Sequence, residues 1–150
     1  MPNTWDVDFG EGVPPGRVPW DTQLDLGVPL MDSQHRELAR LINALESMLK
    51  DDEGSRELVQ ALLLELVDRT SEHFRTERDL MQQSRYPTGP QHDEEHERVL
   101  DHMARLREAH SARKLELTVQ VVRSLWPWLV THIQGLDRDL ARHLRQQASQ

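Results

Sequence analysis

The chain has 150 residues, with 26 acidic and 18 basic side chains and a formal net charge of −8. This length is typical of one domain that buries a hydrophobic core. The absence of cysteine excludes disulfides, iron–sulfur ligation and thiolate zinc sites. The sequence has no basic stripe, so nucleic acid is not predicted as a partner. No apolar run reaches the roughly 20 residues that a membrane span needs.

Residues 1–19 are expected to form an irregular N-terminal arm, because three glycines and four prolines interrupt any helical or strand period there. The segment has neither the basic start nor the apolar stretch of a signal peptide, so we expect a cytoplasmic protein. Residues 20–150 are expected to form the single folded domain.

Four amphipathic helices are predicted after the arm, over residues 31–50, over residues 55–85, from about residue 91, and over residues 115–145. The first shows the pattern clearly, because one histidine and five apolar residues step by three and four and share one face. These positions are His35, Leu38, Leu41, Ile42, Leu45 and Leu49. Short loops between long helices predict antiparallel neighbours, so the fold class is all-α, an up-down-up-down four-helix bundle.

The fourth helix contains a proline inside its apolar pattern. Its inner face is marked by Leu125, Leu129, His132, Leu136 and Leu140. Pro127 removes one backbone hydrogen bond and either kinks or ends a helix. The pattern does not choose between these two outcomes.

Two pairs of residues spaced by four are candidate metal ligands. His92 and His96 lie one turn apart on the same helix face, so both imidazoles can reach one metal ion. His73 and Glu77 repeat this spacing with a carboxylate, whose two oxygens can bridge two metals. Glu77 is in line with Leu80 on the apolar stripe, and a buried carboxylate needs a partner.

A third pair, His132 and Asp137, is spaced by five. On a regular helix five residues turn by about 140° beyond one full turn, so the two side chains do not share a face. A one-residue bulge would make this spacing behave like four, and Gly135 would tolerate it. Regular backbone hydrogen bonding over residues 131–140 would exclude this hypothesis.

Any one of these histidines alone would be interpreted as a satisfied core residue, and His35 as a boundary residue. Together the set contains five histidines and two carboxylates, with at least one from each helix: His35, His73, Glu77, His92, His96, His132 and Asp137. Burying all seven without metal would cost several kcal/mol. Two metal ions that share the carboxylates would use them all. His110 lies roughly 21 Å from His96 along the helix axis, too far to join them, and His102 and His143 are expected to face solvent.

The segments that carry these residues resemble those of stand-alone bacterial hemerythrins. The matching segments are Asp32-Ser33-Gln34-His35, His73-Phe74-Arg75-Thr76-Glu77, His92 through His96, and Trp128-Leu129-Val130-Thr131-His132 with Asp137. The lead-in at Trp20 and Gly27-Val28-Pro29 and the loop at Tyr86-Pro87 also match. The resemblance extends from about Trp20 to Arg145, with all seven ligand positions in order.

The resemblance implies two iron ions with a bridging oxygen species, at a site that binds molecular oxygen reversibly as a carrier, store or sensor and not as an enzyme. It assigns His92, His96 and His132 to one iron. It assigns His35 and His73 to the other iron, which keeps an open position. Glu77 and Asp137 would bridge the irons, and Leu129 would line the oxygen pocket.

Two other functions stay open: a di-iron redox enzyme, such as an oxidase or a peroxide-consuming protein on the same site, and a metal-free helical interaction module. The glutamate-rich oxygen-activating bundles repeat Glu-x-x-His, and no histidine of this chain has that motif. The sequence departs from the hemerythrin pattern at Arg78, where the family often has a second acid.

Overall fold

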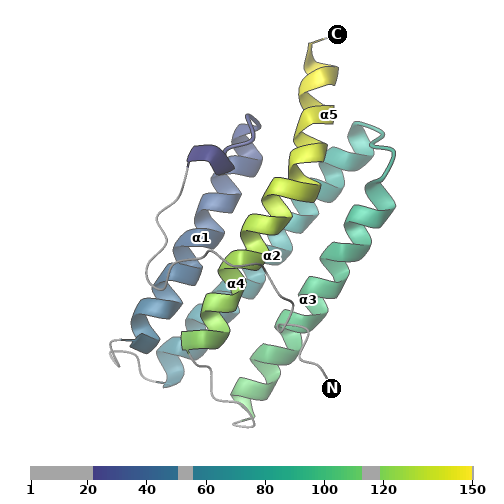
Figure 1. Cartoon of the computed structure of the whole chain (residues 1–150). Helices are drawn as coiled ribbons and strands as arrows, with labels where there is room; N and C mark the ends of the chain where they lie inside the picture. Colours follow the sequence, from purple (N-terminus) through teal and green to yellow (C-terminus); the bar gives the residue numbers. More distant parts are fainter. Residues whose placement is uncertain (1–21, 51–55, 113–118, 150) are drawn as a thin grey trace.

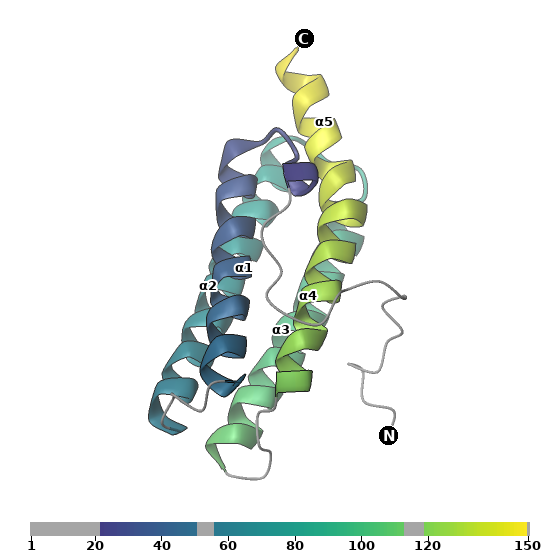
Figure 2. The same ribbon diagram turned by 60° about the vertical axis from the view of Figure 1, so that its left-hand side comes forward.

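The structure is a computed structural model that describes residues 22–50, 56–112 and 119–149, so the expected arm over residues 1–19 lies outside the described residues. Its elements are η1 (Thr22–Leu24), α1 (Pro29–Lys50), α2 (Arg56–Gln83), α3 (Gly89–Ser111), α4 (Val119–His132), η2 (Ile133–Asp137) and α5 (Arg138–Ala148). Figures 1 and 2 show α1, α2, α3 and the α4–α5 segment side by side in one bundle, with successive helices antiparallel. The predicted all-α, up-down-up-down fold is confirmed.

The core lies along the axis of the bundle. The stripe predicted for α1 is buried at Leu38, Leu41, Ile42 and Leu45, and α1 packs against both α2 and α4. Burial of one leucine side chain stabilises the fold by about 1.5–3 kcal/mol. No helix within the described ranges is long and apolar enough to cross a lipid bilayer.

The chain enters α1 through a turn that is tied to the first helical turn. Gly27 has a φ of 80°, a backbone conformation that glycine adopts at little cost. The Asp32 carboxylate accepts hydrogen bonds from the backbone N–H groups of Leu26 at 2.7 Å and Gly27 at 3.1 Å. Pro29 opens the helix, where its missing N–H costs nothing. Asp32 therefore fixes the start of α1 three residues before His35.

The last helical segment contains the interior proline, Pro127, and the bulge expected between His132 and Asp137. α4 continues through Pro127 to His132 without a break. It is followed by η2, a π-helix over Ile133–Asp137, so the bulge hypothesis is confirmed. The extra residue in this wide turn rotates Leu136 toward solvent, where it is 36% exposed. The prediction that Leu136 lies on the inner face is therefore wrong, whereas Leu140 returns to the core.

The α5 helix is held against two loops although its C-terminal end projects beyond the bundle (Figure 1). The His143 Nε2 atom donates to the backbone oxygen of Ser84 at 2.9 Å, and Gln147 Nε2 donates to the same oxygen at 2.7 Å. Arg145 donates to the backbone oxygen of Leu26 at 2.6 Å. His143 and His102 are both partly buried, so the expectation that they face solvent is wrong.

Candidate metal centre

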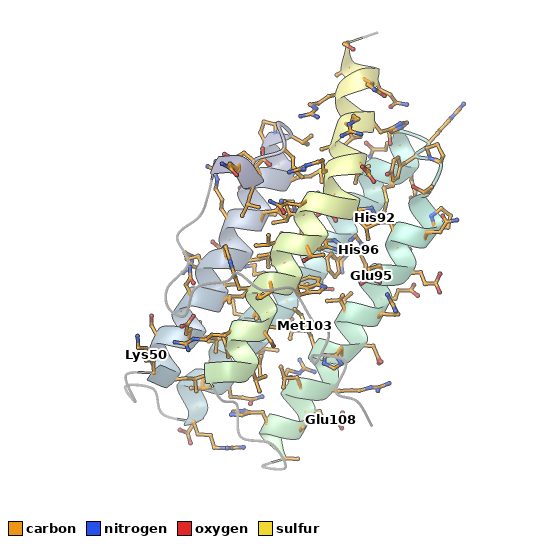
Figure 3. The ribbon with its side chains drawn as sticks, viewed as in Figure 1. Lys50, His92, Glu95, His96, Met103 and Glu108 are labelled. Atoms are coloured by element: carbon orange, nitrogen blue, oxygen red, sulfur yellow. The ribbon has the colours of Figure 1, made fainter. Side chains whose placement is uncertain are left out.

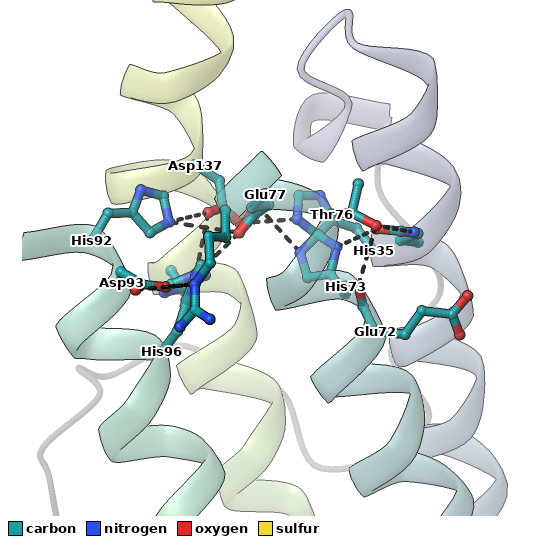
Figure 4. Close-up of polar contacts among 12 residues, drawn as sticks. His35, Glu72, His73, Thr76, Glu77, His92, Asp93, His96 and Asp137 are labelled. Carbon is teal, nitrogen blue, oxygen red and sulfur yellow. Dashed lines mark hydrogen bonds and ion pairs between the residues drawn. The ribbon is translucent and has the colours of Figure 1, made fainter. Parts of the chain in front are cut away.

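The seven candidate ligands meet in the interior of the bundle. They come from four helices and the π-turn, and none is more than 6% exposed: His35, His73, Glu77, His92, His96, His132 and Asp137. Figure 3 places His92 and His96 on the side of α3 that faces the other helices, and Figure 4 shows them with the two carboxylates. The helix faces predicted from the spacing therefore converge on one place.

The seven side chains form two overlapping groups, in each of which the candidate ligand atoms lie within 4.8 Å of one another. The first, the three-histidine group, contains Glu77, His92, His96, His132 and Asp137. The second, the two-histidine group, contains His35, His73, Glu77 and Asp137. Glu77 and Asp137 belong to both, which is the arrangement required of two neighbouring metal ions that share two carboxylates.

The Asp137 carboxylate directs one oxygen to each group (Figure 4). Its Oδ1 atom lies 3.1 Å from the Nε2 atoms of both His92 and His132. Its Oδ2 atom lies 2.8 Å from His35 Nε2. The π-turn makes this possible, because it brings Asp137 to the same side of the helix as His132.

The two oxygens of the Glu77 carboxylate also face different groups. Its Oε1 atom lies 3.0 Å from His96 Nε2 and 3.5 Å from His92 Nε2. Its Oε2 atom lies 3.4 Å from His73 Nε2. Each acid therefore presents one oxygen to the three-histidine group and the other oxygen to the two-histidine group.

Several of these atoms have no hydrogen-bond partner among the residues that the structure describes. They include His73 Nε2, His92 Nε2, both Glu77 carboxylate oxygens and Asp137 Oδ1. A buried polar atom without a partner costs about 1–3 kcal/mol, and more when it is charged. Metal ligation removes this cost, and imidazole with carboxylate is a suitable donor set for iron. The residues present therefore fit a pair of metal ions.

Without metal, the buried histidines lower the pKa values of both carboxylic acids. Burial and the Asp137 carboxylate oppose ionisation of Glu77, but His73 and His92 outweigh them and hold the pKa of Glu77 below its usual range. Burial also opposes ionisation of Asp137, whose pKa His132, His35 and His92 nevertheless hold well below the usual range.

The histidines of the three-histidine group are affected differently. Burial disfavours the charged form of His92, but the neighbouring carboxylates of Asp137 and Glu77 raise its pKa to about 9. The pKa of His132 is also raised, because Asp137 outweighs burial. Burial lowers the pKa of His96. Protons on His92 and His132 must therefore leave when a metal ion binds.

Aromatic rings cover the three-histidine group. Phe74 stacks on His96 with ring centroids 3.7 Å apart and planes 6° apart. Trp128 lies over His132 at 5.4 Å and 26°. Leu129, the predicted pocket residue, is buried one turn before His132. Phe74 and Trp128 therefore place apolar rings against His96 and His132.

Two polar residues beside the two-histidine group were not predicted as site residues. Gln34 contacts His73, and Thr76 contacts Gln34. Each directly precedes a ligand in the sequence, Gln34 before His35 and Thr76 before Glu77. That adjacency is a signal for a residue near the site, but it does not identify the contact.

Arg78, the departure from the hemerythrin pattern, lies outside the cluster. Its Nε atom donates to both carboxylate oxygens of Asp93, at 2.9 and 3.1 Å, and so links α2 to α3 at the surface. His110 also lies outside both ligand groups, as predicted. Its Nδ1 atom forms a hydrogen bond with Gln60.

Known proteins are similar to this chain over most of its length. Residues 26–144 match the family model described as the hemerythrin HHE cation binding domain. The chain is 28% identical over 131 residues to a bacteriohemerythrin of Stenotrophomonas maltophilia (strain R551-3), covering 87% of this chain and 84% of that protein. It is 34% identical over 126 residues to a bacteriohemerythrin of Aquifex aeolicus (strain VF5), covering 79% and 91%. A crystal structure of a wild-type hemerythrin matches with a TM-score of 0.79 and 26% identity, over 85% of this chain and 97% of that one. The chain belongs to the hemerythrin family.

Proposed function

We propose that this protein binds molecular oxygen reversibly at a non-heme di-iron centre. The proposal rests mainly on the placement of the Glu77 and Asp137 carboxylates. Each of them presents one oxygen to each histidine group. Family membership supports iron as the metal. The bacteriohemerythrins among the relatives support oxygen as the ligand.

In this proposal His92, His96 and His132 would hold one iron, and His35 and His73 would hold the other, with Glu77 and Asp137 shared between them. The two-histidine group offers one protein ligand fewer, which would leave room there for a small ligand from outside the protein. Two bound irons with a bridging oxygen species would supply the electrons for reversible oxygen binding.

The protein side chains contribute ligation, charge and exclusion of water. The two carboxylates would offset part of the positive charge of the irons. Phe74 and Trp128 cover the ligands with apolar rings, and together with the buried Leu129 they would protect bound oxygen from water. No nucleophile or general base is required, so the proposed role is that of an oxygen carrier, store or sensor in the cytoplasm and not of an enzyme.

The ligand set favours oxygen binding over the redox-enzyme alternative. Five imidazoles and two carboxylates surround the site, whereas oxygen-activating di-iron bundles are rich in glutamate. Imidazole-rich ligation leaves fewer negative charges to stabilise highly oxidised iron. This difference supports reversible binding.

The test is an optical spectrum of the reduced protein, recorded without oxygen and again after air is added, together with iron analysis. Two irons per chain and a visible band that disappears when oxygen is removed would support the proposal. Two irons that air oxidises rapidly, with steady turnover of peroxide, would support the redox enzyme instead. Protein without iron would support the metal-free module.

The ligand assignment has its own test. His96→Ala is expected to lose at least one iron and the oxygen-dependent band. His110→Ala is the matched control, because His110 is a buried histidine of the same helix outside both ligand groups. It should keep both irons. Full iron and oxygen binding in His96→Ala would contradict the assignment.

A further inference from the structure

The ligand histidines differ on the side that faces away from the carboxylates. The Nδ1 atom of His73 lies 2.7 Å from Gln34 Oε1. The Nδ1 atoms of His35, His92 and His96 are buried without a hydrogen-bond partner among the described residues. His73 thus has an outer contact that these three ligands lack.

The direction of each hydrogen bond around Gln34 follows from its neighbours. Thr76 Oγ1 donates to the backbone oxygen of Glu72 at 3.1 Å, because a carbonyl oxygen only accepts (Figure 4). Thr76 Oγ1 therefore accepts from the Gln34 amide nitrogen, 3.0 Å away. This contact turns the amide so that its oxygen faces His73.

The orientation of the amide determines the proton on His73. An amide oxygen only accepts, so His73 Nδ1 must carry the hydrogen and donate it to Gln34. The lone pair of the neutral ring is then on Nε2, which points toward Glu77 Oε2 at 3.4 Å. The ring is therefore held in the tautomer and orientation that a metal ligand requires.

We propose that Gln34, oriented by Thr76, is a positioning residue that fixes His73 as a ligand and so controls how firmly the two-histidine side holds its metal ion. This inference rests on the proposed di-iron function. A ligand histidine that donates its other N–H to an acceptor is more basic and better aligned, and loss of such a partner costs about 10- to 100-fold in metal affinity. The effect is expected to be greatest here, because this group has the fewest protein ligands.

The chain contains a matched histidine–glutamine pair away from the cluster. His110 Nδ1 forms a hydrogen bond with Gln60 Oε1, and this pair links α3 to α2 as the His73–Gln34 pair links α2 to α1. His110 belongs to neither ligand group. Gln60→Leu therefore removes an equivalent contact between helices without affecting a ligand.

The experiment measures release of ferrous iron from the reduced, iron-loaded protein to an excess of a coloured chelator. Gln34→Leu is expected to speed release of one of the two irons by roughly 10- to 100-fold and to leave the other nearly unchanged. Gln34→Glu keeps an acceptor oxygen and should restore slow release. Gln60→Leu should release iron as the unchanged protein does, although both leucine variants lower the melting temperature of the metal-free protein.

Proton NMR of the reduced, iron-loaded protein gives a second readout. The Nδ1–H of His73 is expected to give a strongly shifted signal that vanishes in D2O. Gln34→Leu should move this signal and speed its exchange, whereas Gln60→Leu should not. If Gln34→Leu does not fold, Thr76→Val removes the hydroxyl that orients the amide and should speed release by a smaller factor.

The positioning role would be overturned if Gln34→Leu released iron at the unchanged rate, or if Gln60→Leu accelerated release equally. Equal acceleration by Gln34→Glu and Gln34→Leu would also overturn it, because the acceptor would then have no effect. If the proposed function itself is wrong, the protein without substitutions takes up no iron, and this is seen before any variant is compared. Unchanged protein with two irons and no response to Gln34→Leu would refute the positioning role alone.

Discussion

His132 Nε2 lies 3.1 Å from Asp137 Oδ1, although five positions separate the two residues in one helical segment. The π-turn over Ile133–Asp137 provides the extra residue that closes this distance. The other oxygen of the same carboxylate lies 2.8 Å from His35 on α1. One local irregularity therefore aims a single acid at both histidine groups.

Deletion of Gly135 is expected to convert the π-turn into a regular helical turn and to preserve iron binding. A π-turn is one residue added to an α-helix, so the deletion leaves Asp137 four positions after His132, on the same face. Insertion of one alanine after Gly135 should instead rotate Asp137 and α5 by about 100° and abolish iron binding. Iron analysis and circular dichroism of both variants measure the outcome.

Gly135→Ala is the control for loss of the glycine itself. A Cβ atom at Gly135 would meet nothing within 4 Å, and no positive φ requires glycine there. The variant should keep two irons and gain about 0.5–1 kcal/mol in free energy of unfolding. Loss of iron from the deletion, together with full iron in Gly135→Ala, would show that the wide turn is itself required.

The four helices and the convergence of the ligands could be predicted, because both depend on the 3.6-residue period of each helix. His92 and His96 needed only their spacing. His132 and Asp137 needed a departure from the period, and the spacing of five was itself the signal for it. The same departure made the prediction for Leu136 wrong, because a regular period was continued past the bulge.

The contact between Gln34 and His73 could not be predicted from the sequence. It joins α1 to α2 and depends on how the two helices are rotated about their axes. It also depends on Thr76, whose hydroxyl orients the amide. Neither relation leaves a periodic pattern within one helix. The docking of His143 on Ser84 was missed for the same reason.

Removal of iron is expected to destabilise the bundle. Iron that binds only the folded site stabilises it by about 2.7 kcal/mol when free iron is one hundred times the dissociation constant. For a domain of this size that corresponds to a fall of roughly 5–11 °C in Tm after chelation. Calorimetry under anaerobic conditions measures the shift. His96→Ala serves as the control, since its Tm should respond much less to iron, and an equal Tm with and without iron would contradict a native metal site.

Leu129→Ala is expected to shorten the lifetime of the oxygen complex. Leu129 is 1% exposed, and truncation should cost about 2–5 kcal/mol of stability and open a path for water. The rate of autoxidation after oxygenation, followed optically, measures the effect. Leu125→Ala is the matched control, because Leu125 is equally buried one turn farther from His132. Similar destabilisation with normal autoxidation is expected for it, and equal acceleration in both variants would argue against a pocket at Leu129.

The metal-free protein is expected to lose stability between pH 6.5 and 9. His92 has a pKa raised from 6.5 to about 9 in the folded protein, and that of His132 is raised as well. A raised pKa stabilises the folded state fully below pH 6.5, and this contribution is lost as the pH rises through 9. For His92 it amounts to about 3 kcal/mol. Thermal melts in the presence of a chelator measure the loss, and His92→Gln should reduce it.

Iron binding is expected to depend on pH in the opposite direction over the same interval. A metal ion requires neutral imidazoles, so each proton displaced from His92 or His132 makes the apparent affinity rise by up to about tenfold per pH unit. The difference in Tm between iron-loaded and metal-free protein should therefore widen from pH 6.5 to 9. Paired melts across this interval measure it. A metal-free protein whose stability stayed level, with an iron affinity that did not rise, would show that Glu77 and Asp137 do not hold protons on these histidines.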